Sequence, residues 1–137
     1  MGTLKDFFKN DLFAADAGVE LVEGGDGRAV ARMVIGPRHF NAAGVVQGGA
    51  IFTLADFAFA VACNSRGRLT TGISTTMTFV RPATSGQLLA VAEEIHCGRT
   101  ISNYLVRVSD DAGKTVAMFQ GTAFRLEKEM PLDSEPS

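Results

Sequence analysis

A run of apolar residues broken by one carboxylate constrains the fold of this sequence more than any other feature. Between Ala50 and Ala62 the only side chains with polar groups are Thr53 and Asp56. A helix that is apolar on every side is a buried helix, and we expect one over residues 48–65. In a chain of 137 residues, the remaining segments must supply the layer that covers it.

Asp56 is the residue in this run that points to function. An isolated carboxylate in apolar surroundings is costly unless it is paired, hydrogen-bonded or open to a water-filled pocket. The neighbouring sequence offers no cation. Asp56 therefore protonates, finds a distant partner, or lines a pocket in which its charge takes part in chemistry. A structural aspartate that caps or braces a neighbour is the alternative.

The rest of the chain has the pattern of strands, with one short helix expected over residues 4–9. Strands are expected at residues 18–23, 27–35, 73–79, 87–97, 100–109 and 116–124. Turns are indicated at Gly24–Gly27 and Asp110–Gly113. The alternation of Ile73, Met77 and Phe79 with polar residues predicts a half-buried antiparallel strand. Two strands, one helix and four strands together predict an α+β fold, an antiparallel sheet curled around one long helix.

Composition limits the possible partners. The net charge is −2 and no run of Lys or Arg is present, which argues against nucleic acid or an anionic membrane surface. The charged start of the chain does not resemble a signal peptide, and the apolar run is too short to span a bilayer. We expect one domain over residues 1–126 and a polar, disordered tail over residues 127–137.

The cysteines and histidines do not have the spacing of a metal site or a redox pair. We expect Cys63 and Cys97 to be buried thiols of a cytoplasmic protein. His39 is interpreted as a hydrogen-bonding residue of the loop before the helix, and His96 lies far from it in the sequence.

The stretch from His39 to Asp56, followed by residues 79–83 and 98–100, resembles the hotdog-fold thioesterases of the phenylacetate-degradation (PaaI-like) type. The likeness runs from about residue 15 to residue 126, and its most specific part is the spacing Asn-x6-Gly-Gly-x6-Asp. It implies a hotdog fold and an acyl or aromatic acyl thioester of coenzyme A as substrate. It also implies a homodimer, or a tetramer built as a dimer of dimers. Beyond the coenzyme A of the substrate, no cofactor or metal is expected.

Gly48 begins the predicted helix and suits an oxyanion hole. The first backbone N–H groups of a helix have no intrahelical partners and carry partial positive charge. A glycine there lets a thioester carbonyl approach the backbone, where the N–H donors stabilise the developing oxyanion. A tight loop-to-helix turn is the alternative, and it suits Gly49 better, as a small residue needed for packing.

Asp56 and Gly48 cannot meet within one chain. Eight residues of helix separate them by about 12 Å, whereas both must lie within roughly 3 Å of one reacting centre. The site must then be shared between two subunits. The resemblance implies the same arrangement, with Asn41 and Gly48 of one protomer facing Asp56 of the other. It makes Asp56 the general base or nucleophile, and gives Asn41 the role of holding water or substrate.

Gln47 is the departure from the family pattern, because a histidine usually precedes the two glycines. Glutamine can donate a hydrogen bond or orient the loop, but it cannot titrate near neutrality. This counts against the related hotdog dehydratases, whose chemistry depends on a loop histidine. The proposed hydrolysis asks no proton transfer of this position.

Two further segments resemble coenzyme A contacts. Arg81 and Arg99 are the plausible phosphate partners, and solvated arginines at strand ends are the alternative. The substrate-binding residues implied by the resemblance are Gly49, Arg81, Pro82, Gly98, Arg99 and Thr100. Aromatic residues could line an acyl tunnel, although most are expected in the core. These are Phe7, Phe8, Phe52, Phe57 and Phe59.

The sequence thus favours an acyl-CoA thioesterase in which Asp56 assists the attack of water. Fold resemblance alone does not determine function. A non-catalytic acyl-CoA-binding module and a hotdog-fold enoyl-CoA hydratase or dehydratase remain the alternatives. Release of free thiol separates hydrolysis from both.

Overall fold

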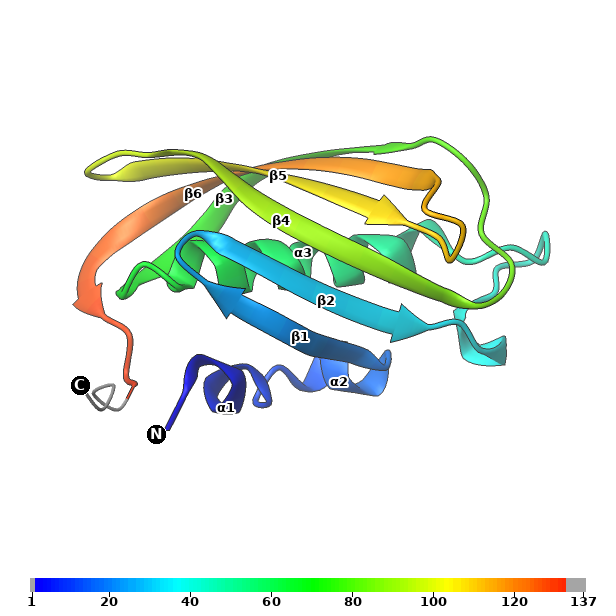
Figure 1. Cartoon of the computed structure of the whole chain (residues 1–137), viewed down its shortest axis with the longest axis horizontal. Coiled ribbons are helices and arrows are strands. Elements are labelled where there is room, and N and C mark those ends of the chain that lie inside the picture. The colour runs from blue at the N-terminus through cyan, green and yellow to red at the C-terminus, as the bar shows by residue number, and fades with distance from the viewer. Residues whose placement is uncertain (1, 133–137) are drawn as a thin grey trace.

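The structure, a computed structural model, describes residues 2–132 (Figure 1). Three helices, a short 3-10 turn and six strands make up this part of the chain. Their bounds are α1 (Leu4–Phe8), α2 (Leu12–Asp16), β1 (Val19–Gly25), β2 (Arg28–Val34), η1 (Pro37–His39), α3 (Gly48–Asn64), β3 (Arg68–Phe79), β4 (Gln87–Cys97), β5 (Ile101–Ser109) and β6 (Thr115–Glu129).

The six strands form one antiparallel sheet in the order β1-β2-β4-β5-β6-β3. The sheet curves over α3, which runs along its inner side (Figure 1). This is the hotdog arrangement expected from the sequence. Helix α3 lies against the sheet with Leu54, Ala58 and Ala62 fully buried, because its apolar residues occur on nearly every side.

Glycines on the inner side of the sheet allow α3 to approach closely. A Cβ added at Gly121 of β6 would lie 2.6 Å from the ring of Phe59, and one added at Gly72 of β3 would lie 2.8 Å from the same ring. Phe59 itself is 2% exposed and packs against Tyr104 and Phe119. Its large ring therefore fits where two neighbouring strands have no side chains.

The first hairpin turns where the glycine cluster predicted it. Asp26 and Gly27 connect β1 to β2, and both have positive φ, 52° and 78°. Two such residues are typical of the type I′ turn, whose twist matches that of the strands. Aspartate and glycine are among the residues that adopt this conformation most readily.

Helix α2 was not predicted. Asp11 starts it, since its side chain accepts a hydrogen bond from the Ala14 N–H at 3.1 Å. Both α1 and α2 contact β1, the strand at one edge of the sheet. They leave two large apolar side chains of α2 in solvent, Leu12 at 71% and Phe13 at 75% exposure.

Strand β3 differs from the prediction of a half-buried strand. Ile73 is 55% exposed and Phe79 53%, and only Thr70 of the strand is buried. The reason is its position, because β3 is the second edge of the sheet and is hydrogen-bonded to β6 alone. Alternation in the sequence identifies the strand but cannot tell that Ile73 and Phe79 stay exposed at an edge of the sheet in the single chain.

The C-terminal boundary was placed too early. Strand β6 continues to Glu129, and the N–H of Met130 donates to the Gly67 carbonyl at 2.8 Å. The Met130 side chain is 6% exposed. Burial of this one apolar residue thus orders the first residues of the expected tail, while residues 133–137 lie outside the part that the structure describes.

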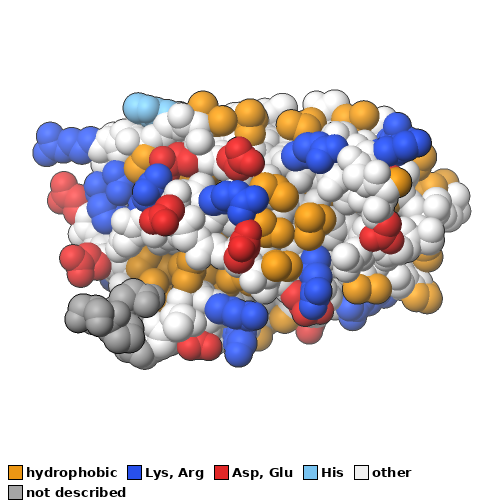
Figure 2. All heavy atoms as spheres, in the orientation of Figure 1, with side chains coloured by type: hydrophobic (Ala, Val, Ile, Leu, Met, Phe, Trp, Pro, Cys, Tyr) orange, Lys and Arg blue, Asp and Glu red, His pale blue; other side chains and the backbone are white. Residues whose placement is uncertain are grey.

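Charges of both signs are interspersed on the face of the molecule in Figure 2. Neighbouring strands β1 and β2 contribute two exposed ion pairs, Arg28 with Glu23 and Arg32 with Glu20. This mixing of charges agrees with the absence of a basic run in the sequence. The face therefore has no continuous patch of Lys and Arg side chains of the kind that binds a nucleic acid.

Candidate active site

The loop before α3 and the first turn of this helix hold most of the residues singled out by the sequence. Gln47 is the N-cap, and its side-chain oxygen accepts a hydrogen bond from the Gly49 N–H at 3.0 Å. Across residues 2–132, the Gly48 N–H has no hydrogen-bond partner. Gln47 therefore satisfies one donor of the helix start and leaves the donor of Gly48 free.

The two glycines differ in what a side chain at each position would meet. Gly49 was interpreted as the packing glycine, but it is exposed, and a Cβ there would lie 2.5 Å from the side-chain oxygen of Gln47. Gly48 is half-buried, and a Cβ there would lie 3.0 Å from the Phe79 ring. Gly49 thus makes room for the cap, and Gly48 for an aromatic neighbour.

Asn41 shapes the loop with its side-chain oxygen, which accepts from the N–H groups of Ala43 at 2.9 Å and Val45 at 3.3 Å. This is the turn role that the residue type alone indicates. The Asn41 side chain is exposed, and its amide nitrogen has no partner in the described chain. One side of the amide thus builds the loop, and the other remains able to donate to a ligand.

His39 anchors the same loop. It is 4% exposed, its Nδ1 accepts from the Gly36 N–H at 3.0 Å, and its Nε2 lies 2.7 Å from the carbonyl oxygen of Ala17 at the end of α2. Nε2 therefore carries the proton in this arrangement. The His39 carbonyl accepts from the Gln47 N–H at 2.7 Å, so one residue ties α2 to the start of α3, in agreement with the loop hydrogen-bonder predicted for this position.

Asp56 lies on α3 between the buried residues Ala55 and Phe57. No hydrogen bond or ion pair reaches its carboxylate from the residues between 2 and 132. Burial raises the pKa of Asp56 above its usual value, and repulsion from the Asp11 carboxylate raises it further. Asp56 is thus a half-buried carboxylate without a counter-charge, as the apolar run indicates.

One chain does not bring Asp56 and Gly48 together. They belong to one continuous helix, so about 12 Å of helix axis separates them. Gly48 lies instead beside Arg81 and Pro82, along a hollow of about 310 Å³ that Val45 and Phe79 also line. We call this the Arg81 hollow.

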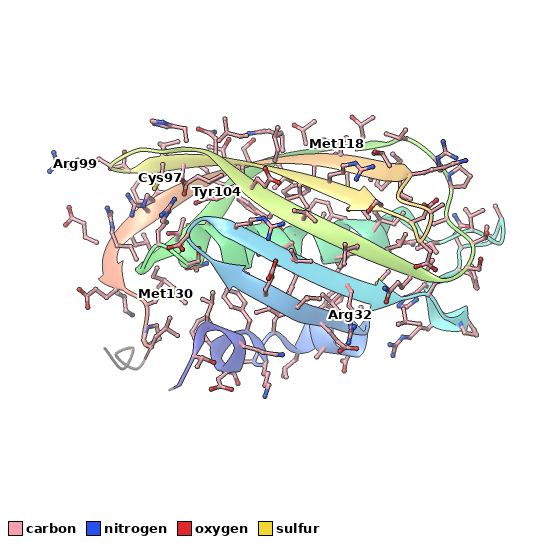
Figure 3. All side chains as sticks on the ribbon, in the orientation of Figure 1. Arg32, Cys97, Arg99, Tyr104, Met118 and Met130 are labelled. Atoms are coloured by element: carbon pink, nitrogen blue, oxygen red, sulfur yellow. The ribbon has the colours of Figure 1, made fainter. Side chains whose placement is uncertain are left out.

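Arg99 lies at the far end of the molecule. Figure 3 shows Arg99 with Cys97 near the turn between β4 and β5, whereas α3 begins at the opposite end. The Arg99 carbonyl accepts from Arg68, and Gly98 pairs with Ile101 across the turn. A single chain therefore separates Gly98, Arg99 and Thr100 from Arg81 and Pro82.

Most of the aromatic residues proposed as tunnel walls belong to the core. Phe57 and Phe59 are buried, and Phe52 packs against Phe119 with ring centroids 5.6 Å apart. Phe8 packs against Phe57, and Phe7 packs against Phe8. The sequence could not separate core rings from pocket rings, because both occur in apolar segments.

Two aromatic residues that the sequence analysis did not single out line a second hollow beside the start of α3. This Phe13 hollow has a volume of about 450 Å³. Its walls are Phe13, Asp16, Ala17, Arg38, His39, Phe40, Gln47, Gly49, Ala50 and Thr53. Phe13 is the second residue of α2, and recognition of that short helix would have been the signal.

The remaining side chains give no indication of a metal. No group of three or more His, Cys, Asp or Glu between residues 2 and 132 is arranged to hold an ion, and the expectation of hydrolysis without metal or redox cofactor stays a prediction. Burial raises the pKa of the Cys63 thiol to about 12, whereas Cys97 is half-buried rather than buried. No helix in this part of the chain is long and apolar enough to cross a membrane.

Comparison with known proteins agrees with this fold and these residues. The family described as the thioesterase superfamily matches residues 43–117. A protein of Archaeoglobus fulgidus, described as a candidate esterase, is 38% identical over 93% of this chain and 84% of its own length. The acyl-coenzyme A thioesterase PaaI of Escherichia coli is 34% identical over 87% of this chain and 86% of its own.

Solved structures give the same result. The structure of the E. coli PaaI protein from the phenylacetic acid degradation operon superposes with a TM-score of 0.87 at 33% identity, covering 90% of this chain and 91% of that one. The chain therefore belongs to the thioesterase superfamily of hotdog proteins. This confirms both the expected fold and the expected class, a thioester hydrolase.

Proposed function

We propose that this protein hydrolyses acyl-CoA thioesters in sites shared between two subunits, with Asp56 of one and Gly48 of the other at each reacting centre. One observation carries the proposal, the half-buried Asp56 carboxylate that lacks any partner in the described chain. A half-buried carboxylate without a counter-charge costs free energy of folding, and such groups are typical of sites where the charge takes part in chemistry.

The chemistry asked of Asp56 agrees with its surroundings. A carboxylate with a raised pKa is a stronger base than one in water, and a general base works best with a pKa closer to the working pH. Deprotonated Asp56 takes a proton from a water molecule as that water attacks the thioester carbonyl. In the alternative, the Asp56 carboxylate attacks the thioester carbonyl directly, the C–S bond breaks and the coenzyme A thiolate leaves, and water then opens the mixed anhydride to the free acid and the carboxylate.

Gly48 supplies the complementary group. Its N–H has no partner in the described residues, and the dipole of the 17-residue helix α3 adds partial positive charge at this end. An N–H placed in this way stabilises the oxyanion formed in the attack. The Asn41 amide, on the loop just before the helix, provides a second donor for water or substrate.

Sharing between subunits follows from two observations. Asp56 and Gly48 are fixed along one helix and cannot reach one carbonyl. Strand β3 is an edge with exposed apolar side chains, Ile73 and Phe79, and such an edge pairs readily with a second strand. A second copy that pairs there covers these side chains, and a two-fold axis gives two equivalent sites.

A tetramer as a dimer of dimers and a cytoplasmic location remain predictions.

Thiol release from acyl-CoA in the presence of a thiol reagent is the direct test. The wild type should release coenzyme A, and Asp56→Asn should lower kcat by roughly 100-fold or more while the fold is kept. Asp26→Asn makes the same carboxylate-to-amide change at an exposed residue of the turn between β1 and β2, where asparagine also fits the positive φ, and this control should retain activity. Near wild-type turnover by a folded Asp56→Asn protein contradicts the role given to Asp56.

Mixed dimers test the sharing. Asp56→Asn and Asn41→Ala subunits, unfolded and refolded together, form heterodimers in which one of the two sites has both native residues. Activity should return in the mixture and not in either parent alone. If mass spectrometry shows heterodimers and no activity returns, although each parent is inactive, the shared site is wrong.

The two alternatives predict different products from the same experiment. A binding module retains acyl-CoA without releasing thiol, and a hydratase adds water to enoyl thioesters reversibly without releasing thiol. No observation on the site favours either of them over hydrolysis. Gln47, which takes the place of the usual histidine, has its own structural role as the cap of α3.

A further inference from the structure

The chain between η1 and α3 folds back on itself as a short hairpin over residues 39–47. At the base of the 39–47 hairpin the Gln47 N–H donates to the His39 carbonyl at 2.7 Å, and nearer its tip the Asn41 N–H donates across it at 2.8 Å. Gly48 follows directly at the base, as the first residue of α3. The position of Asn41 relative to Gly48 therefore depends on how this hairpin is held.

The 39–47 hairpin has little apolar burial of its own to hold it. Within it only His39 and Val46 are buried. On one side the Val46 N–H donates to the carbonyl of Ala83, itself a buried residue, at 2.9 Å. On the other side the anchor is the His39 ring. One of the two anchors is thus a polar side chain that a substitution can alter.

The imidazole of His39 uses both ring nitrogens on backbone groups. Nδ1 accepts from the Gly36 N–H at 3.0 Å, within the 3-10 turn just before the hairpin. The Nε2–H donates to the carbonyl of Ala17, the C-cap of α2, at 2.7 Å. The first bond is local, whereas the second joins residues 22 apart in the sequence. The bond to Ala17 is therefore the one that ties the hairpin to another element of the fold.

Helix α2 is a firm support for this bond. Asp11 caps its start, Ala14 is 1% exposed, and the helix lies against β1 and α3. A hydrogen bond from a buried ring also has a narrow range of favourable distances and angles. The bond therefore fixes both the distance and the orientation of the hairpin base relative to the core.

From this geometry we propose that His39 is a positioning residue for the hydrolysis proposed above, through the bond of its Nε2–H to the Ala17 carbonyl. This bond holds the 39–47 hairpin against α2, and the hairpin in turn holds Asn41 and Gly48 at the reacting centre. The inference rests on the proposed function. His39 itself exchanges no proton with the substrate, because both of its ring nitrogens are occupied by the backbone.

The expected effect of losing the bond is on turnover. A displacement of about 1 Å in a group that acts on the transition state can cost roughly 100-fold in rate. The donors at Gly48 and Asn41 act on the oxyanion and on the attacking water, so a loosened hairpin should lower kcat. The coenzyme A arm contacts other residues in this proposal, and KM should change little.

His39→Asn and His39→Gln form a matched pair, because each keeps one of the two ring functions. The Asn side-chain oxygen is as many bonds from the backbone as Nδ1, so it still accepts from Gly36. The Gln amide nitrogen is as many bonds away as Nε2, so it still donates to Ala17. In steady-state kinetics, His39→Asn should lower kcat for an acyl-CoA about tenfold, and His39→Gln should stay within about threefold of wild type.

A control variant separates positioning from a general loss of stability. Gly121→Ala weakens the fold on the sheet side of α3, where the added methyl would overlap the Phe59 ring, and leaves the 39–47 hairpin untouched. Calorimetry gives the Tm of every variant, and kcat is measured well below the lowest Tm. Gly121→Ala should lower Tm and keep kcat, whereas His39→Asn should lower kcat while the protein is folded.

Hydrogen exchange separates failure of the positioning from failure of the hydrolysis. The amides of Asn41 and Gln47 in the hairpin, and of Ala17 and Gly18 at the end of α2, are hydrogen-bonded. In wild type they should exchange through one common opening, with one free energy and one denaturant dependence. His39→Asn should speed exchange of the hairpin amides, and His39→Gln should not. A protein with this coupling that hydrolyses no acyl-CoA retains the His39 anchor and refutes the hydrolysis.

Three kinetic outcomes overturn the proposal. The first is a wild-type kcat in His39→Asn. The second is an equal loss in His39→Asn and His39→Gln, since the bond to Ala17 would then not be responsible. The third is an equal loss in Gly121→Ala, since kcat would then follow stability. If neither His39 variant folds, exchange in the wild type decides, because separate openings of the hairpin and of α2 contradict the coupling and a common opening supports it.

Discussion

Replacing Asp56 should make the protein more stable while making it less active. The carboxylate has no partner in the described chain and burial raises its pKa, so its ionised form is disfavoured in the folded state. Asn has nearly the same shape and no charge. At neutral pH, Asp56→Asn should therefore raise the free energy of unfolding, contrary to the effect of most substitutions at half-buried sites.

The size of the effect follows from burial. Burying an ionised carboxylate without a partner costs more than burying a neutral amide of the same shape, and we take this difference as only about 1 kcal/mol because the remaining exposure of Asp56 screens its charge. For 137 residues the entropy of unfolding is about 0.29 kcal/mol/K. A gain of about 1 kcal/mol then raises Tm by about 3.5 °C. The accompanying loss of roughly 100-fold in kcat corresponds to about 2.7 kcal/mol.

The pH dependence has a definite sign. A carboxyl whose pKa is raised in the folded state contributes its full stability below the pKa of the unfolded chain, and that contribution is lost as pH rises through the folded pKa. Wild type and Asp56→Asn should therefore have similar Tm values below about pH 3.8, the usual value for this group. They should diverge as the pH is raised.

Differential scanning calorimetry from pH 3 to pH 8 measures both effects, with Asp16→Asn as the control. Asp16 is an exposed aspartate of α2, and its replacement should leave the Tm within about 1 °C at every pH. A variant at Asp56 that is equally stable or less stable at pH 7 refutes the reasoning, because it would mean that a cation or donor of the assembled protein satisfies the carboxylate.

Three further predictions concern other parts of the molecule. Arg81→Ala should raise KM for acyl-CoA about threefold to tenfold with little change in kcat, since a phosphate contact is made equally in ground and transition states; an unchanged KM in steady-state kinetics would make Arg81 a solvated residue. Gly121→Ala should destabilise the fold by about 1–3 kcal/mol in urea unfolding, because the added methyl would overlap the Phe59 ring. Glu94→Gln removes a carboxylate whose pKa is held low by the Arg66 side chain, at 2.9 Å. It should cost about 1 kcal/mol at pH 7, and that difference should shrink as pH falls through the lowered pKa.

Long, strongly patterned elements could be predicted from the sequence, and short or uncovered ones could not. The buried helix and the strand at residues 87–97 agree with α3 and β4 almost residue for residue, because their apolar patterns are decided by local spacing. Helix α2 has five residues, too few to show a period. The exposure of Ile73 depends on which strand ends the sheet, and that is a property of topology.

The same division applies to the site. The spacing of Asn41, Gly48 and Asp56 marked a loop, a helix start and a lone carboxylate, and the structure has each of these in that form. The hydrogen bonds among them could not be foreseen, since they depend on side-chain torsions. In particular, the side chain that lies over Gly49 is that of Gln47, a residue that the sequence presented as a departure from the pattern.

The glutamine cap has a consequence for how the enzyme would respond to acidity. The Gln47 amide stays neutral over the whole pH range in which proteins are stable. The charge at the start of α3 therefore does not change during a titration. In a relative with histidine at this position, two groups near the carbonyl would titrate within a few units of each other, and the profile would belong to the pair. Here the acid limb of a pH–rate curve should have a slope of one, because a single group titrates in it. The pH dependence of the rate would then report the ionisation of the Asp56 carboxyl alone.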